Sequence, residues 1–551
     1  MTMRAGIFLI ALTVGLAAAA CDAPEAVRAP ASASEGRTPT ASRGPGGGTF
    51  RYGIGEPTAI VPPLARTADD LAVVDAVFDS LTAWDPTGDP MSSAAVTWTA
   101  TEQQDEWAFD LRPGAAFQDG TAVLASDFAA AWTLLIQEGV YGYLLADVVG
   151  YQAVSAGEQT TLSGVTVVDD HTLRVGLARS RSDFPTVVGH PALGPINVAQ
   201  SEQDRDGWRD LPSGNGPFAM TEPWARGDFI RAARWDQWAN GQRPPRGIDE
   251  VVFNIGDLDL NYLAFIRGRR DLTSVPPDAL GLAQEQFPAR GGVWDGPGLI
   301  TGARPEVYLL GINPSVPPYD QVEVRQAVSL AIDRIRLSDF GQDVQLQPAT
   351  ALLPPPLPGT RADVCELCTF NQFGARSRLQ DAGVDQLTFA FNAGGGHERI
   401  RNHLRQSLSD IGVALVSNGR GAAPSLSDYQ QLLSDGSVGL FRLPLVADVP
   451  SALSVLYPLL HSDQTPENGG LNYMRYRDPT VDALLEQASR TPDKRTREAL
   501  LRRVEDIALN TDHVVVPLFT YQHSVVAAER VQNLRYSPFG LVDIPQLSLT
   551  P

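Results

Sequence analysis

Residues 107–132 read WAFDLRPGAAFQDGTAVLASDFAAAW, and this stretch carries the strongest fold signal in the sequence. Apolar side chains alternate with small or charged ones from Trp107 to Leu111, which is the period of a half-buried strand. Pro113-Gly114 ends the strand. Asp119-Gly120 marks a second turn, because glycine accepts a positive φ without a Cβ clash.

A helix is predicted directly after these turns. Ser126 and Asp127 are residue types that cap helices. Apolar residues then fall on one helical face, at Phe128, Ala131, Trp132 and Leu135. None of these residues carries catalytic chemistry, so we interpret the stretch as a scaffold element built by aromatic packing.

The length and charge of the chain narrow its class. It has 551 residues, 43% of them hydrophobic, and a formal net charge of -21 at pH 7. This length exceeds what one compact core usually holds, so two or three lobes are expected. An acidic surface repels phosphate backbones, which argues against a nucleic-acid partner. Lys494 is the single lysine, which excludes a P-loop and disfavours Schiff-base chemistry.

The N-terminal segment predicts export. Residues 1–20 contain a short basic start, an apolar run too short for a membrane span and small residues before Cys21, which is typical of a signal peptide. The segment resembles a bacterial lipoprotein signal in which Cys21 is lipidated; the alternative is an ordinary secretory signal with an incidental cysteine. Residues 21–47 are rich in Ala, Ser, Pro and Gly and predict a flexible tether. We expect an extracytoplasmic protein of the cell envelope, held at the membrane by the lipidated cysteine.

The other two cysteines are Cys365 and Cys368, in the motif VCELC. A zinc site needs two more ligands, and none lies nearby in the sequence. An exported protein favours oxidation of such a pair, so we predict a small structural disulfide between them. The sequence predicts no metal site and no cofactor.

Strands and helices alternate along the rest of the chain, which favours an α/β architecture. A strand followed by a helix is predicted for residues 252–272, a strand for 307–315 and a helix for 322–334. Residues 397–417 read as a helix, a stop at Gly412 and a strand. Two amphipathic helices at 479–490 and 493–510 precede a strand at 513–519.

The opening stretch resembles the signature of the family 5 extracytoplasmic solute-binding proteins, the oligopeptide-, dipeptide- and nickel-binding group of ABC importers. The positions that match this signature are Leu111, Arg112, Gly114, Phe117, Asp119, Gly120, Ala125, Asp127 and Trp132. Further matches follow in the family's order: the first strand at 47–58, the turn GNGPF at 214–218, and segments at 318–334 and 472–485. The resemblance therefore covers nearly the whole chain after the tether.

This resemblance implies a two-lobed periplasmic-binding-protein fold of the large class (cluster C type), with a ligand cleft between lobes joined by a two-segment hinge. Lobe I would comprise residues 48–304, with an inserted subdomain, and 520–551. Lobe II would comprise residues 305–519. Such lobes enclose their ligand by hinge motion, so that a few polar groups hold it away from water.

The resemblance also indicates one binding residue. Residues 445–456, LVADVPSALSVL, resemble the family segment W-x-A-D-Y-P, whose Asp pairs with the N-terminal ammonium of a peptide. That position is Asp448 here, and the alternative is that Asp448 caps the following helix, 450–460. The family's Trp and Tyr are Leu445 and Val449, which changes the wall of the pocket.

Two further places are candidates for ligand contact. The segment Glu56-Pro57-Thr58 corresponds to a family segment whose backbone can bind an extended ligand as an added strand. Tyr308 lies at the predicted hinge and either faces the ligand or packs as a hinge aromatic.

Two fragments of the sequence look like catalytic motifs, but neither has the residue spacing that such a motif requires. His397-Glu398 is followed by His403, and six residues turn a helix by roughly 600°, so the two imidazoles do not share a metal-binding face. The segment DGSVG at 435–439 lacks the first glycine of a nucleophile elbow. We therefore predict that the protein is not an enzyme.

The function predicted from the sequence is a lipid-anchored, monomeric substrate-binding protein. It would capture short peptides, or a similar polar solute, for the permease of an ABC importer. The alternative is an envelope lipoprotein of the same fold that regulates a membrane enzyme or cell-wall lipid assembly without transport. The absence of the two aromatic residues beside Asp448 keeps this alternative open.

Overall fold

The computed structural model describes residues 47–204, 206–239, 247–291, 296–339, 345–417 and 422–550. The predicted signal peptide (1–20), Cys21 and all of the predicted tether except its last residue lie outside these residues. In the ranges that are described, no helix is both long enough and apolar enough to cross a membrane.

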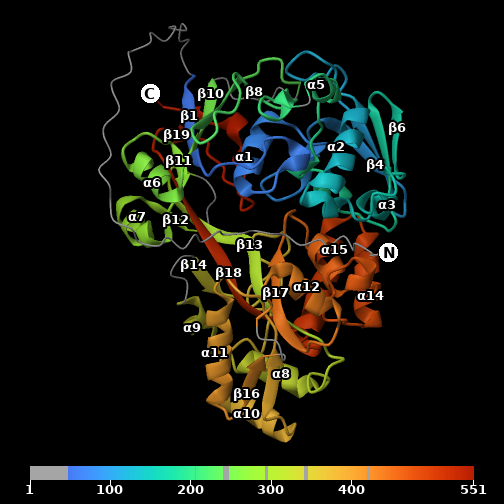
Figure 1. The fold of residues 1–551 in the computed structure, drawn as a ribbon, viewed down its shortest axis with the longest axis vertical. Coiled ribbons are helices and arrows are strands. Elements are labelled where there is room, and N and C mark those ends of the chain that lie inside the picture. The colour runs from blue at the N-terminus through green and yellow to red at the C-terminus, as the bar shows by residue number, and fades with distance from the viewer. Residues whose placement is uncertain are drawn as a thin grey trace.

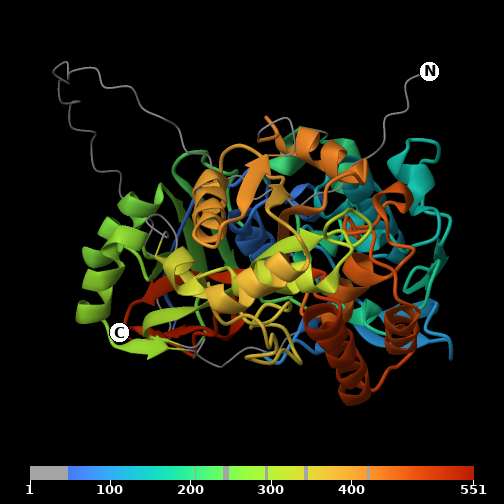
Figure 2. The same cartoon turned by 90° about the horizontal axis from the view of Figure 1, so that it is seen from below.

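The protein is a mixed α/β molecule with two lobes (Figure 1). The upper lobe in that view contains the blue, teal and green segments together with the red C-terminal end, and we call it lobe I. The lower lobe, lobe II, contains the yellow and orange segments. Seen from below, lobe II lies in front of the blue and teal segments of lobe I (Figure 2).

Two long strands connect the lobes. They are β13 (Gly298–Ile312) and β18 (Val515–Ala527), which pair antiparallel along almost their whole length. The pairing has register shifts between Ala303 and Val307 and between Tyr308 and Leu309. Both strands belong to a ten-stranded sheet whose main path runs β12-β13-β18-β11-β1-β10-β9-β8, with β14 on β18 and β17 on β13.

Lobe I is built from the first half of the chain. Its strands are β1 (Thr49–Ile54), β2 (Thr82–Trp84), β3 (Pro90–Ser92), β4 (Ala95–Ala100), β5 (Glu106–Leu111), β6 (Val165–Asp169), β7 (Thr172–Gly176), β8 (Phe218–Met220), β9 (Phe229–Arg234), β10 (Glu250–Ile255), β11 (Leu272–Ser274) and β12 (Ala289–Gly291). Its α-helices are α1 (Ala68–Val77), α2 (Ala125–Glu138), α3 (Tyr151–Ser155), α4 (Phe184–Val187), α5 (Val198–Gln203), α6 (Leu258–Ile266) and α7 (Leu280–Gln286). β4, β5, β7 and β6 form a separate four-stranded sheet.

Lobe II contains the remaining helices. They are α8 (Val322–Leu330), α9 (Arg334–Ser338), α10 (Gln372–Asp381), α11 (His397–Ser409), α12 (Leu426–Ser434), α13 (Ala452–Leu460), α14 (Pro479–Ser489) and α15 (Lys494–Asp506). Its strands are β14 (Gln345–Pro348), β15 (Gln386–Phe389), β16 (Ala414–Ser417) and β17 (Leu440–Val446). The chain then returns through β18 to lobe I, where β19 (Val531–Gln532) pairs with β20 (Ser548–Leu549). The strands and helices predicted between residues 252 and 519 are present, except that the helix predicted for 322–334 ends at Leu330 and a separate helix, α9, begins at Arg334.

The opening stretch forms β5 and α2, as predicted. Trp107, Phe109 and Leu111 are buried, and the indole N–H of Trp132 donates to the carbonyl oxygen of Leu193 at 2.9 Å. The cap differs from the prediction: α2 begins at Ala125, with Leu124 as its N-cap, so Ser126 already lies inside the first turn. Asp127 still helps to cap the helix, because its carboxylate accepts a hydrogen bond from the backbone N–H of the N-cap residue, Leu124, at 2.8 Å.

The hydrophobic cores divide where the chain crosses between the lobes. One cluster of buried residues runs from Phe50 to Ile300 and resumes at Val525, while two further clusters lie between Val307 and Phe519. This division supports the predicted domain limits near 304 and 520, which stay predictions. Val449 is an exception, because it follows β17 of lobe II yet packs in the cluster of lobe I. Cys365 and Cys368 are joined by a disulfide in lobe II.

Candidate functional site

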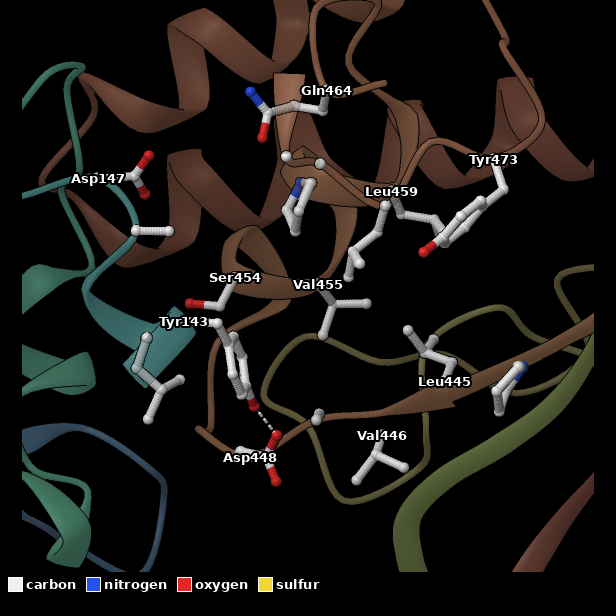
Figure 3. Close-up of a pocket in the computed structure, with 18 of the residues that line it drawn as sticks. Tyr143, Asp147, Leu445, Val446, Asp448, Ser454, Val455, Leu459, Gln464 and Tyr473 are labelled. Carbon is white, nitrogen blue, oxygen red and sulfur yellow. Dashed lines mark hydrogen bonds between the residues drawn. The ribbon is translucent and has the colours of Figure 1, made fainter. Parts of the chain in front are cut away.

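A cavity of about 190 Å³ lies where the two lobes meet (Figure 3). Lobe I contributes the short 3-10 helix Tyr141–Leu145, helix α3 and the segment after β7. Lobe II contributes β17, the loop that follows it and helix α13. The polar side chains of this wall are Tyr143, Asp147, Tyr151, Gln152, Arg179, Arg181, Tyr429, Gln430, Arg442, Asp448, Ser454, Gln464 and Tyr473.

Asp448 lies in the wall of this cavity and is hydrogen-bonded to a residue of the opposite lobe. It follows the end of β17 by two residues, and its Oδ2 atom accepts a hydrogen bond from the hydroxyl of Tyr143 in lobe I (Figure 3). Burial raises the pKa of the Asp448 carboxyl to about 6, the hydrogen bond from Tyr143 lowers it, and the nearby Glu306 raises it. Asp448 therefore offers a partly desolvated carboxylate to a ligand at neutral pH.

The helix-capping alternative for Asp448 is wrong. The helix after this loop, α13, begins at Ala452, and its N-cap is Ser451, whose hydroxyl accepts the backbone N–H of Ser454. Asp448 lies three residues before that cap. Its carboxylate thus has no part in starting the helix.

An aliphatic wall replaces the aromatic one that the family segment would supply. Leu445 lines the cavity and points towards Val455 and Leu459 of α13 (Figure 3). Val449 also borders the cavity, although most of its side chain is buried in the core of lobe I. The two positions where the family has Trp and Tyr are therefore packed, and the space beside Asp448 is lined by branched aliphatic side chains.

The edge of β17 that faces away from β13 is paired with Ala390 at Leu440 and Arg442. From Pro444 to Val446, next to Asp448, this edge has no strand partner among the described residues. In the described sheet the one named partner strand of β17 is β13. The N–H of Ala447 donates to the carbonyl oxygen of Pro305, and successive residues of a strand direct their N–H groups to opposite sides. The N–H of Val446 thus points away from β13. Pro444 precedes it on the same side of the strand and, as a proline, has no N–H group that needs a partner there.

The side chain of Arg442 lies on the same face of the strand as that of Asp448. Positions 442, 444 and 446 are the partly exposed ones in β17, and Asp448 continues this period of two. The Nη1 atom of Arg442 donates to the side-chain oxygen of Asn392 at 2.9 Å, and its Nε atom is buried without a hydrogen-bond partner among the described residues. A fixed cation and a carboxylate therefore lie on one face of this strand.

A buried ionic cluster closes the opposite part of the cavity. Arg179 and Arg181 both pair with Asp147, at 2.6 and 2.9 Å, and Arg181 also pairs with Asp183 at 3.0 Å. Asp183 accepts hydrogen bonds from Ser451, at 2.6 Å, and from Ser454 of lobe II, at 2.7 Å. Burial raises the pKa of the Asp183 carboxyl, but the charge and hydrogen bonds of Arg181, together with the hydrogen bonds from the two serines, hold it well below its usual range. The cluster thus joins lobe I to the start of α13.

The other predicted contact residues lie elsewhere. The carboxylate of Glu56 accepts the N–H of Gly227 at 2.7 Å, and Thr58 donates to Asp70 through both its backbone and its hydroxyl, at 2.7 Å. Glu56, Pro57 and Thr58 do not appear in the wall of this cavity. Tyr308 is buried in β13, where its ring packs against Phe519 with centroids 4.9 Å apart. Their contact with a ligand stays a prediction.

Several residues of the wall were missed by sequence reasoning. Arg442 was detectable, since it lies six residues before Asp448 on one face of a strand with period two. Tyr143, Asp147 and Arg179 gave no such signal, because they come from lobe I, some 300 residues away along the chain. Within the described residues, no group of three or more His, Cys, Asp or Glu side chains is placed to hold a metal ion.

Comparison with known proteins places the fold and family. Residues 89–467 match the family described as bacterial extracellular solute-binding proteins, family 5 Middle. The dipeptide-binding protein DppE of Bacillus subtilis is 23% identical over an alignment of 512 residues that covers 89% of each chain. The oligopeptide-binding protein OppA of the same organism is 25% identical over 87% of this chain and 88% of its own. These relatives are binding proteins, which confirms the predicted non-enzymatic class.

Solved structures agree with the fold. The murein tripeptide-binding protein MppA, in its unliganded open form, superposes with a TM-score of 0.76 at 20% identity, covering 91% of this chain and 97% of that one. HbpA2 from Haemophilus parasuis also gives a TM-score of 0.76, at 19% identity over 92% of this chain and 100% of that one. The two-lobed binding-protein architecture predicted from the sequence is confirmed.

Proposed function

The chain belongs to the bacterial extracellular solute-binding proteins of family 5, and we propose that it captures short peptides outside the cytoplasm for an ABC importer. The observation that carries this proposal is the partly desolvated carboxylate of Asp448, beside an unpaired strand edge, in a cavity shared by both lobes. The printed names of the dipeptide- and oligopeptide-binding relatives support the same ligand class.

Asp448 is the proposed anchor for the peptide's ammonium group. Its Oδ2 atom is occupied by the hydroxyl of Tyr143, while its other oxygen keeps lone pairs for a cation. An ammonium and a carboxylate form a charge-assisted hydrogen bond, which is strong where water is excluded. Tyr143 holds the carboxylate from the opposite lobe, so ligand binding at Asp448 involves both lobes.

The strand edge and Arg442 suit the rest of a peptide. An extended peptide can pair with the free N–H of Val446 and the carbonyl of Pro444, as an added strand does. The guanidinium of Arg442 lies farther along this strand, where its unpartnered Nε–H can donate to a carboxylate. A cation site and an anion site on one face of the strand are complementary to a short zwitterion.

The finer parts of the function follow from the same proposal. We infer that the protein acts as a monomer, that it is anchored through a lipid on Cys21, and that it delivers its ligand to the permease of the importer. Cys21 lies outside the described residues, so the anchor rests on the sequence pattern alone. The intact mass of the protein from its native membrane tests it: a diacylglyceryl addition at the N-terminus supports the anchor, and an unmodified mature chain overturns it.

Native mass spectrometry of the purified protein tests the ligand class. A set of short peptides is offered with free N-termini and again with acetylated N-termini. We expect complexes with the free peptides and their loss on acetylation, because acetylation removes the charge that pairs with Asp448. Release of a single non-peptide compound from the purified protein, together with indifference to all peptides, would overturn the proposal.

A further inference from the structure

Arg179 lies in the cavity wall, and groups of the protein itself fix its guanidinium on two sides. Its Nε and Nη2 atoms donate to the two oxygens of Asp147, at 2.6 and 2.7 Å. One face of the guanidinium lies over the ring of Tyr457, with its central carbon 3.7 Å from the ring centroid. Bidentate pairing and stacking on an aromatic ring are the contacts that hold an arginine side chain most rigidly.

The remaining nitrogen of Arg179 has no partner. Nη1 is buried, and none of the described residues accepts a hydrogen bond from it. A buried donor without an acceptor is unfavourable, and more so when the group is charged. The edge of the guanidinium opposite Asp147, formed by Nη1 and the second hydrogen of Nη2, is therefore able to take two oxygens of a further carboxylate.

The charges around Arg179 permit a further anion. The cluster of two arginines and two aspartates is balanced, because Asp147 is shared by Arg179 and Arg181 and Arg181 also pairs with Asp183. Asp147 therefore leaves no excess negative charge to repel a ligand carboxylate. Asp147 lies on the far side of Ser454 from Tyr143 in the close-up view, so this subsite is separate from the Asp448 anchor (Figure 3).

The unpartnered groups of the wall share one chemistry. Besides Nη1 of Arg179, the buried atoms that lack a partner include Nε of Arg442 and the amide nitrogen Nε2 of Gln430. All three are N–H donors. A ligand that satisfies all three must present several acceptor oxygens, apart from the cation that Asp448 holds.

We propose that Arg179 binds an acidic side chain of the ligand, so that the cavity prefers short peptides that contain aspartate or glutamate. The proposal rests on the proposed function, since it adds a second ionic contact to the peptide held at Asp448. A guanidinium that is already oriented by Asp147 and Tyr457 gives this contact at little entropic cost.

Isothermal titration with matched tripeptides tests the proposal. One set carries glutamate at the first, second or third position among alanines, and the other set carries glutamine at the same position. The isosteric amide keeps size and hydrogen bonding but removes the charge. We expect one glutamate position to bind at least about tenfold more tightly than its glutamine counterpart, which corresponds to one charge-assisted contact.

The variant Arg179→Gln should reduce the ratio of affinities for the glutamate and glutamine peptides to about one. The affinity for the glutamine peptides themselves should change less. Arg174→Gln is the matched control, because Arg174 is half-exposed and pairs with Glu106 at 3.7 Å on the surface of lobe I. The control should keep the full preference. A structural role for Arg179 alone would lower the binding of both sets equally and leave the ratio unchanged.

The outcomes separate this inference from the proposed function. Tight binding of alanine and glutamine peptides with no charge preference at any position overturns the role of Arg179 and leaves peptide capture intact. A preference that survives in Arg179→Gln also overturns it. If no tripeptide of either set binds the unaltered protein, peptide capture itself fails.

Discussion

Tyr143 of lobe I donates its hydroxyl hydrogen to the carboxylate of Asp448 in lobe II, so one hydrogen bond joins the two walls of the cavity. Asp448 could be identified from its sequence segment, but its partner could not. Burial together with this contact raises the pKa of the Tyr143 hydroxyl well above its usual value, so the phenol stays a donor throughout the physiological range. The bond fixes the carboxylate without neutralising it.

Asp448→Asn should weaken the binding of peptides with a free N-terminus by about 2–5 kcal/mol, because the desolvated ammonium loses its counter-charge. The amide keeps the shape of the side chain and an oxygen for Tyr143. Titration calorimetry measures the change, with Asp236→Asn as control, since the Asp236 side chain is 83% exposed. An unchanged dissociation constant in Asp448→Asn would remove this residue from the site.

Peptide binding should weaken in mild acid. The ammonium needs the ionised form of Asp448, whose pKa is raised to about 6, so we expect affinity to fall about tenfold per unit of pH below that value. The pH dependence of folding stability has the opposite sign. Because the pKa of Asp448 is raised, protonation favours the folded state. This stabilising contribution is complete below about pH 4 and is lost as the pH rises through 6. Titrations at about pH 5 and about pH 7.5 measure the first effect. Asp448→Asn should lack both dependences, and an equal pH dependence in that variant would contradict the assignment.

Asp183→Asn should destabilise the protein. The side chains of Asp183 and Arg181 are 1% and 8% exposed, and removing the charge of Asp183 leaves Arg181 with Asp147 as its remaining anion. Breaking a buried pair costs about 3–5 kcal/mol, and we expect a value near the lower limit because Asp147 remains. Denaturant unfolding followed by tryptophan fluorescence measures it. The exposed pair of Arg234 and Asp236 supplies the comparison, where Asp236→Asn should cost under about 1 kcal/mol. Equal losses in the two variants would show that the cluster adds no stability.

Arg442→Gln should abolish the distinction between peptides with a free C-terminus and those with an amidated one. In the unaltered protein we expect the free acid to bind more tightly by about 1.5–3 kcal/mol, as for a hydrogen bond to a charged group. The variant should bind both forms equally, at the level of the amide. A preference for the free acid that persists in Arg442→Gln would place the carboxylate at another cation.

Local patterns in the sequence predicted local structure well. The alternation from Trp107 to Leu111 became β5, and the helical spacing through Trp132 became α2, because both depend on neighbours within a few residues. The cap of α2 was misplaced by two residues because Asp127 acts from the third helical position rather than from the cap itself. Helix ends depend on such single hydrogen bonds, which spacing alone does not resolve.

The sequence by itself determined the α/β class, the family, the order of the elements and the position of Asp448, because these follow from periodicity and from motifs that are contiguous in the chain. Only the tertiary structure decided what surrounds Asp448. Tyr143 comes from the opposite lobe, Arg179 is oriented by Asp147 and Tyr457, and the two aromatic positions of the family are packed as Leu445 and Val449. A binding site between two lobes is made by residues hundreds of positions apart, and their distances are set by how β13 and β18 join the lobes.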